Sequence, residues 1–499
     1  MKYIIGIDIG TSGTKAIAFA VNGDILYSAY ASYPMITKQQ GEQELDPGIL
    51  LEASVTTIGE IMRNSDPANK LIGIGFSSAM HSVIAVDKNG VPLSPVITWA
   101  DLRSEESAAK IRNTDIGKRI YEHTGTPIHP MSPLCKIMWI RDKQPEIFSK
   151  TAKFISIKEY IWYHFFGKFL VDYSIASGTG LFDIRNFKWY DEALHTAGIT
   201  IDHLSEAVSP LHIETDLQKK YQQVLGLPDK IPFVIGGSDG CLANLGSHAI
   251  EPGEMALTIG TSGAARLVSE KPKHDSRARI FNYILTEQLY VSGGAINNGG
   301  NVIRWWTDHF MNKPGSGQNN FAENLQEVAD IPAGSEGLIF LPYLLGERAP
   351  VWDANAKGVF FGITPNHSSG HFLRAILEGI GFSLYSIGLS LEETVGPVKK
   401  IYASGGFINS DLWVQIVSDI FDKNVYVTNV ADASATGAAM IGLLALREIK
   451  NLEETRTMMQ IQKTFLPDKA NHSVYLKNFF IFESLYEKLK DEFEKIKKL

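Results

Sequence analysis

The sequence Ile4-Ile-Gly-Ile-Asp-Ile-Gly-Thr-Ser-Gly-Thr-Lys15 decides the fold of this chain, because part of it occurs twice. The pentapeptide Ile-Gly-Thr-Ser-Gly spans residues 9–13 and again residues 259–263, each time directly after an apolar run typical of a buried strand. A turn repeated over so long an interval indicates two domains built on one plan. The copies differ two residues before the first glycine, where the first has Asp8 and the second has Thr258.

Length and composition indicate a large globular protein and argue against several other classes. A chain of 499 residues exceeds a single core, so we expect at least two domains. A net charge of −8 argues against nonspecific nucleic-acid binding. The two cysteines, Cys135 and Cys241, support neither a disulfide framework nor a zinc site. No signal peptide precedes the first strand and no apolar run reaches the ~18 residues of a membrane helix, so we expect a cytoplasmic protein that binds no membrane.

The order of apolar runs predicts an α/β fold, because strand-like and helix-like segments alternate along the chain. Asn22-Gly23 between two apolar runs predicts a hairpin. The segment Glu251-Pro-Gly-Glu254 is taken as the boundary between domains 1–250 and 251–499. Helices are expected at 372–394 and 434–446, an exposed loop at 313–320 and an amphipathic docking helix at 482–499.

The first turn has the composition of a phosphate-binding loop. Its glycines allow the backbone to approach a ligand, and its N–H groups and hydroxyls can then face phosphate oxygens. The residues concerned are Thr11, Ser12, Gly13, Thr14 and Lys15. No Walker A pattern occurs in the chain, and a plain hairpin turn is the alternative.

Two isolated carboxylates lie beside glycine-rich turns. Asp8 interrupts an apolar strand, where a buried carboxylate is costly unless it is paired or binds a metal such as Mg²⁺; the alternative is an aspartate that caps its own turn. Asp239 follows the strand 233–235 within Gly-Gly-Ser-Asp-Gly. Transfer of a phosphoryl group to an alcohol needs a base near the hydroxyl, which an aspartate can supply, although aspartate is also common in ordinary turns.

Further glycine-rich and polar segments are candidates for ligand contacts. Gly405 and Gly406, before Asn409, would let a purine or its ribose lie against the backbone, or would form a strand-to-helix turn with an N-cap. The segment 293–300 is open to the same two interpretations. A polyol or sugar acid needs several convergent donors and acceptors, and a substrate carboxylate favours a nearby cation, although a lone His or Arg is often structural. Candidates of this kind are Met80, His81, Asp101 and Arg103.

Nearly the whole chain resembles the FGGY family of carbohydrate kinases. Residues 6–15 are similar to the first phosphate turn of that family and residues 259–263 to its second, while Asp239 falls where the family places its catalytic base. Met131-Ser-Pro-Leu-Cys-Lys-Ile-Met-Trp-Ile140 resembles the N-terminal pattern, apart from Lys143, which we interpret as a surface variation. The C-terminal pattern is matched by Gly358-Val-Phe-Phe-Gly-Ile363, followed by His371 and Glu378.

The resemblance implies two actin-like (ribonuclease H-like) ATPase domains flanking a central catalytic cleft that holds ATP. Domain 1–250 would carry the substrate, the Mg²⁺ at Asp8 and the first phosphate turn, and domain 251–499 would bind the nucleotide. His81, Asp101 and Arg103, with Met80 and Asp239, would contact the substrate. The implied nucleotide contacts are Thr11, Ser12, Gly13, Thr14, Lys15, Gly260, Thr261, Ser262, Gly300, Gly405, Gly406 and Asn409. A homodimer is a family-level expectation.

Within the family, three stretches are similar to the gluconate kinases: residues 76–84, 98–104 and 125–131. They imply the phosphorylation of a sugar acid, gluconate, to 6-phosphogluconate. Xylulose kinases, which act on a ketose, are the alternative, since they share Met-His and Asp-x-Arg but typically have glycine where this chain has Ser82. A non-catalytic actin-like ATPase module is a third hypothesis, against which the Asp239 turn and the pair of Asp101 and Arg103 count.

Overall fold

The computed structural model describes residues 1–39, 41–310, 328–430 and 432–496, and the chain forms two compact units. Unit 1 comprises Met1–Ile250, Val268–Ser292 and Val430–Gln460. Unit 2 comprises Glu251–Leu267, Gly293–Asn429 and Ile461–Leu499. The chain first passes from unit 1 to unit 2 at residues 250–251, next to the segment taken as the domain boundary, and it later returns twice to unit 1.

A six-stranded sheet of order β13-β14-β5-β1-β2-β3 forms the centre of unit 1. Strand β1 runs antiparallel to β2 and parallel to β5, and β14 is parallel to β5. The strands of this unit are β1 Lys2–Ile9, β2 Gly13–Ala20, β3 Ile25–Ser32, β4 Glu44–Leu45, β5 Lys70–Ser78, β6 Ile84–Val86, β7 Val96–Ile97, β8 Lys153–Ile155, β9 Leu170–Asp172, β10 Phe182–Asp183, β11 Lys188–Trp189, β12 Glu206–Val208, β13 Ile213–Glu214, β14 Phe233–Ser238 and β17 Phe281–Ile284.

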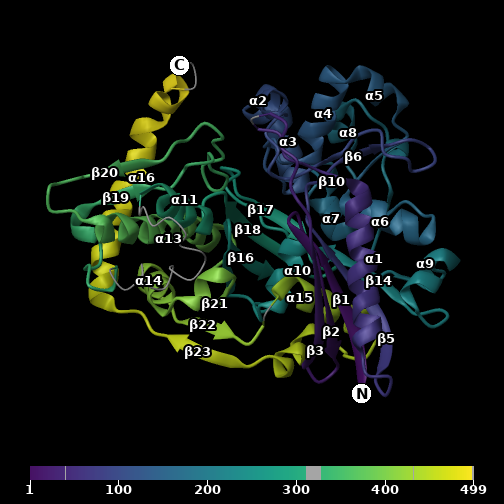
Figure 1. Cartoon of the computed structure of the whole chain (residues 1–499). Coiled ribbons are helices and arrows are strands. Elements are labelled where there is room, and N and C mark those ends of the chain that lie inside the picture. The colour runs from purple at the N-terminus through teal and green to yellow at the C-terminus, as the bar shows by residue number, and fades with distance from the viewer. Residues whose placement is uncertain (40, 311–327, 431, 497–499) are drawn as a thin grey trace. The chain divides into compact units, whose positions relative to one another are not determined.

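Helices cover both faces of this sheet because its central strands are apolar on both sides. Ile5 and Ile7 of β1 join an apolar cluster with residues of α1, whereas Ile4 on the opposite face joins a cluster with α15 (Figure 1). The helices of unit 1 are α1 Pro47–Asn64, α2 Glu105–Arg112, α3 Asp115–Thr124, α4 Pro133–Lys143, α5 Pro145–Lys150, α6 Ile157–Phe166, α7 Tyr173–Ser177, α8 Asp191–Ala197, α9 Lys219–Leu225, α10 Asp239–Gly246 and α15 Ala433–Ala445.

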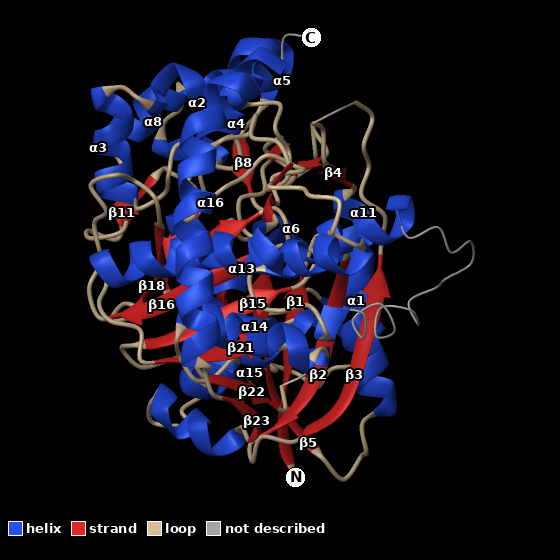
Figure 2. Ribbon diagram, turned by 90° about the vertical axis from the view of Figure 1, so that its left-hand side faces the viewer, coloured by secondary structure: helices blue, strands red, loops and turns tan. Residues whose placement is uncertain are grey.

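Unit 2 repeats the strand order of unit 1 around its own glycine-rich turn. Strand β15 runs antiparallel to β16 and parallel to β21, as β1 does to β2 and β5, and β22 follows β21 in parallel (Figure 2). The strands that lie wholly or mainly in unit 2 are β15 Glu254–Ile259, β16 Gly263–Ser269, β18 Tyr290–Ile296, β19 Ile339–Leu341, β20 Val359–Phe361, β21 Lys400–Ser404, β22 Val425–Thr428 and β23 Ile461–Phe465. The helices are α11 Gly300–Phe310, α13 Ser369–Thr394, α14 Asp411–Phe421 and α16 Lys469–Ile496.

The mixed α/β class predicted from the sequence is confirmed, and so are the two expected helices, observed as α13 and α15. The C-terminal helix α16 begins earlier than predicted, at Lys469, and buries Phe482, Leu485 and Phe493. The predicted loop 313–320 and the last residues, 497–499, lie outside the described residues. Among the described helices, α13 alone has the length and hydropathy of a membrane span, but 83% of its apolar window is buried inside the protein, as in a core helix.

Candidate active site

The first glycine-rich turn is a tight connection between β1 and β2. Gly10 N donates to Gly13 O at 3.0 Å, which closes the turn. Tyr33 donates its hydroxyl to Gly10 O at 2.7 Å, and the Thr14 hydroxyl lies 3.2 Å from the same Tyr33 oxygen. Thr14 is fully buried, so its side chain holds the turn in shape, whereas Ser12 is exposed to solvent. Of the predicted phosphate contacts, those at the tip of the turn are therefore accessible.

Asp8 lies at the end of β1, opposite Lys15 in the antiparallel register. Ser77 of the neighbouring β5 donates its hydroxyl to Asp8 Oδ1 at 2.6 Å. Burial raises the pKa of Asp8 well above its usual range, and the negative charges of Asp432 and Asp239 raise it further. Lys15 opposes these effects. Two carboxylates from distant chain regions thus act on Asp8 within unit 1.

Asp432 was not identified from the sequence. It is the N-cap of α15, where its side chain accepts from Ala435 N at 2.9 Å, and its Oδ2 lies 3.5 Å from Lys15 Nζ. Its only sequence signal is a capping residue before an alanine-rich helix, which says nothing about the β1–β2 turn. The packing of α15 against β1 brings it there.

The carboxylates of Asp8, Asp239 and Asp432 fit a hard divalent cation, because oxygen ligands and uncompensated negative charge favour Mg²⁺. Among the described residues, no three His, Cys, Asp or Glu side chains come close enough to form a metal site by themselves. Mg²⁺ does not require such a group, because it uses one or two carboxylates and completes its shell with waters and substrate phosphates.

Asp239 is the first residue of α10, whereas the sequence predicted a turn at this point. Ser238 caps the helix by accepting from Cys241 N at 3.4 Å, and Asp239 Oδ1 accepts from Gly240 N at 2.7 Å. A carboxylate at a helix N-terminus is stabilised by the helix dipole. Glycines favour a turn at this point of the sequence, but β14 continues through Gly236 and Gly237 to Ser238, and α10 begins directly after it.

The second glycine-rich turn, in unit 2, is also closed by a hydrogen bond from its first glycine, but the acceptor lies one residue earlier than in the first turn. Gly260 N donates to Ser262 O at 2.8 Å, and Gly300 N, at the start of α11, donates to Gly260 O at 2.7 Å. Thr258 occupies the position equivalent to Asp8 and shares a hydrogen bond of 2.8 Å with Ser404 of β21. The second turn therefore lacks the carboxylate but keeps a hydroxyl pair from two adjacent strands.

The glycines after β21 lie close to this second turn. Gly405 has φ = +94°, and a side chain there would collide with Ile259 O. Gly405, Gly406 and Asn409 are exposed, and Asn409 Nδ2 donates to Gly406 O at 3.1 Å within the short 3₁₀ helix Gly406–Asn409. The structure thus brings together Gly260, Gly300 and Gly405, three of the predicted nucleotide contacts in unit 2.

His81 lies in unit 1 in a left-handed backbone conformation, with φ = +65°. Its Nδ1 donates to Gly178 O at 2.7 Å, and its Nε2 lies 3.3 Å from the Tyr283 hydroxyl. Lys136, which is fully buried, donates to His81 O and to Met131 O, both at 2.6 Å. The histidine is therefore fixed on its backbone and on both ring nitrogens, and only 6% of it is exposed.

Arg103 and Asp101 form a compact ionic cluster with Glu44. Arg103 Nε donates to both oxygens of Asp101 at 2.9 Å, and Nη2 donates to Glu44 Oε1 at 2.8 Å. Asp101 is fully buried and also accepts from Gln43 N, so its place in the structure is to orient Arg103. Within the described residues, Arg103 Nη1 makes no hydrogen bond and has the Glu42 carboxylate at 4.0 Å, so this edge of the guanidinium is the one least engaged by the protein.

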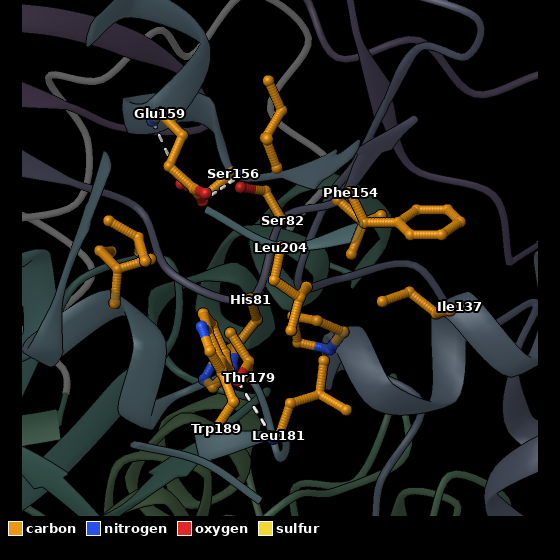
Figure 3. Close-up of a pocket in the computed structure, with 15 residues that line it drawn as sticks. His81, Ser82, Ile137, Phe154, Ser156, Glu159, Thr179, Leu181, Trp189 and Leu204 are labelled. Carbon is orange, nitrogen blue, oxygen red and sulfur yellow. Dashed lines mark hydrogen bonds between the residues drawn. The ribbon is translucent and has the colours of Figure 1, made fainter. Parts of the chain in front are cut away.

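A small cavity of about 20 Å³ lies beside His81 (Figure 3). Its lining is mainly apolar, with polar groups from His81, Ser82 and Glu159. Pockets that bind small molecules are more than ten times larger, at roughly 300–1,000 Å³, so this cavity is not the sugar pocket. Ser82, which we expected from the sequence to mark a difference from xylulose kinases, is buried and accepts from Ile157 N at 3.1 Å. It supports the start of α6, and Met80 packs partly buried beside it.

The comparison with protein families decides the assignment. Residues 3–246 match the N-terminal domain of the FGGY family of carbohydrate kinases, and residues 255–446 match the C-terminal domain of the same family. The chain belongs to the FGGY family of carbohydrate kinases.

Similar proteins cover the FGGY chain from end to end. The gluconokinase of Bacillus subtilis (strain 168) is 42% identical over 99% of this chain and 98% of its own. The crystal structure of gluconate kinase from Lactobacillus acidophilus aligns with a TM-score of 0.93 at 34% identity and covers 99% of each chain. The ligand-bound xylulose kinase from the same organism aligns with a TM-score of 0.92, also at 34% identity, over 99% of this chain and 100% of its own. These likenesses confirm the actin-like two-domain fold class.

Lys136 is a residue of this FGGY kinase whose role sequence analysis missed, although it lies in the stretch 131–140. Replacing it with Met is expected to raise the KM for sugar by about tenfold or more, because hydrogen bonds from a charged donor to two carbonyls of the His81 loop are lost. Steady-state kinetics on the purified variant measure this change. An unchanged KM would contradict it.

The same variant has a pH signature. Burial lowers the pKa of Lys136 from 10.5 to about 7, so between these values the unfolded chain binds one more proton than the folded protein. The free energy of unfolding therefore gains up to ~1.4 kcal/mol per pH unit from this group above pH 7, and the gain is absent in Lys136→Met. The free energy of unfolding of the wild type minus that of Lys136→Met should therefore increase between pH 7 and 9. The same difference for Lys118→Met, a control at an exposed lysine, should stay constant.

Proposed function

We propose that this protein transfers the γ-phosphoryl group of ATP to the O6 hydroxyl of gluconate in the cytoplasm. The carbohydrate kinase chemistry follows from the family, whose members use ATP as a substrate. The choice of gluconate is supported by one observation above all, the 42% identity to a gluconokinase over almost the whole chain. The acidic cluster in unit 1 supports phosphoryl transfer, since Asp239 and Asp8 lie in one electrostatic neighbourhood.

In the proposed reaction, Asp239 accepts the proton of the O6 hydroxyl as the oxygen attacks the γ-phosphorus. The bond from that phosphorus to the bridging oxygen breaks, and ADP leaves with the electron pair. Magnesium, when bound, neutralises phosphate charge, and Asp8 would hold it mainly through water. Lys15 and the tip of the first turn would bind phosphate oxygens, as would the second turn, residues 260–262.

The sugar acid would be oriented by the substrate side of unit 1. We assign Arg103 to the substrate carboxylate through its Nη1 edge, with Asp101 and Glu44 fixing the guanidinium plane. His81 would contact a sugar hydroxyl from its rigid loop, and Met80 would provide an apolar contact. The N-terminal domain, 1–250, would then carry the substrate, the metal ion and the first phosphate turn, and the C-terminal domain, 251–499, would hold the nucleotide.

A coupled kinase assay across gluconate, xylulose, glycerol, ribulose and rhamnulose tests this proposal. The expected result is the highest kcat/KM on gluconate, with ADP release that depends strongly on the sugar acid. A preference for xylulose would instead support the second candidate, which the equal similarity to a xylulose kinase structure favours. ADP release at the same rate with and without any sugar would reject a kinase and indicate an ATPase module.

A further inference from the structure

The strand that leads to Asp239 contains an irregularity. In the parallel pairing of β14 with β5, Val234 lies opposite Gly75 and Gly237 lies opposite Ser77, so Ile235 and Gly236 together face Phe76 alone. Such a β-bulge bends a strand and re-aims the residues after it, and bulges are common beside active sites. Asp239 begins α10 two residues after the end of this bulge.

One buried ammonium group holds the carbonyls on both sides of the bulge. Lys158 of α6 donates from Nζ to Ile235 O at 3.0 Å and to Gly237 O at 2.8 Å. Its Nζ also lies 2.6 Å from Asp172 Oδ2, and the side chains of the pair are 2% and 0% exposed. The ammonium group therefore donates two hydrogen bonds to backbone carbonyls and forms an ion pair with Asp172.

Asp172 connects this ion pair to a second support of the same backbone. Its Oδ1 accepts from Ile175 N at 2.9 Å and so caps α7. Ser174, in the first turn of α7, accepts from Ser238 N at 3.1 Å, and its hydroxyl lies 3.0 Å from the Ser238 hydroxyl. The residue immediately before Asp239 is therefore bound to the helix that Asp172 caps. We call Lys158, Asp172 and Ser174 the β14 clamp.

The ammonium also acts on Asp239 through space. Burial lowers the pKa of Lys158, while the charges of Asp172, Glu159 and Asp239 raise it. Lys158 and Asp239 are therefore electrostatic neighbours as well as parts of one supported segment. Buried ion pairs in general add little stability over apolar residues of the same size.

We propose that the β14 clamp is a positioning device for Asp239, which fixes the backbone ahead of this carboxylate. The inference rests on the proposed role of Asp239 as the base of the kinase reaction. Lys158, Asp172 and Ser174 are positioning residues, because they act on the substrate hydroxyl through Asp239 alone.

The principal test is the double variant Lys158→Met/Asp172→Asn, which removes both charges together and keeps the cap on α7. With gluconate and ATP, we expect kcat to fall about tenfold at pH 7 with KM values within twofold of wild type. A lower melting temperature with unchanged kcat would overturn the proposal.

Two further variants keep the outcomes distinct. If the double variant does not fold, Ser174→Ala removes only the contacts to Ser238, and kcat should fall about threefold to tenfold with KM values within twofold of wild type; an unchanged kcat would overturn the proposal. In an Asp239→Asn background, the double variant should cause no further loss of kcat. Near-normal turnover in Asp239→Asn alone would reject Asp239 as the base. If Asp239→Asn loses turnover but the clamp variants keep the kcat of the wild type, only the role of the clamp is rejected.

Discussion

Asp239→Asn is expected to lower kcat by ~10²–10⁴ with little change in the KM for ATP. The amide has nearly the same shape as the carboxylate and can still accept from Gly240 N, so the start of α10 should remain intact. It cannot accept a proton from the attacking hydroxyl, and phosphoryl transfer would then rely on positioning alone. Steady-state kinetics with gluconate, together with circular dichroism of the purified variant, measure the loss and the retained fold.

The matched control is Asp191→Asn. Asp191 is also the first residue of a helix, α8, but it is exposed and belongs to no proposed ligand contact. The control loses the same interaction with a helix dipole, worth about 0.3–1 kcal/mol, and should keep the turnover of the wild type. Turnover of Asp239→Asn within a factor of three of the control would reject Asp239 as the base.

The second large effect is expected at the bulge, from Gly236→Ala. Gly236 has φ = +65°, and an added Cβ would meet the carbonyl of Phe76 on the neighbouring strand. The backbone cannot yield without separating β14 from β5, so we expect a loss of about 3–5 kcal/mol in the free energy of unfolding, at the upper end for single substitutions. Chemical denaturation followed by tryptophan fluorescence gives the value, and kcat should fall as well because Asp239 follows the bulge.

Gly226→Ala separates the collision from the cost of the backbone conformation. Gly226 ends α9 with φ = +64°, and an added Cβ there has no heavy atom within 4 Å. It should cost only about 1 kcal/mol, the ordinary penalty of a left-handed residue with a side chain. If both alanine variants lost the same stability, close packing at the bulge would not be the reason.

The fold could be predicted to a large extent because its determinants are local. The runs Ile4–Ile9 and 255–259 are mostly apolar, as expected for strands buried on both faces of a sheet. The turns that follow them repeat the same residues. The repeat further implied one plan for two domains, and the strand pairings of β1 and β15 follow that plan. Such local patterns are good predictors because the local preference of each segment agrees with its place in the packed fold.

The site was predicted less completely because its residues meet only through tertiary packing. Asp432 resembles any helix cap, and Lys158 any lysine in an amphipathic helix, until α15 and α6 dock on the sheet. Sequence reasoning also placed Asp101 among the substrate contacts on the basis of residue type. In the structure its oxygens accept from Gln43 and Arg103, which a sequence pattern does not reveal.

The return of the chain to unit 1 at Val430–Gln460 has a consequence for biosynthesis. Helix α15 covers Ile4 and Ile17 on one face of the central sheet, and the ribosome makes this helix after almost nine-tenths of the polypeptide. Until α15 is made, the apolar sheet face that it covers has no partner. Exposed apolar surface of this kind favours aggregation of the nascent chain unless chaperones or a transient partner cover it. A fragment of residues 1–250 alone would lack α15, and we therefore expect it to aggregate.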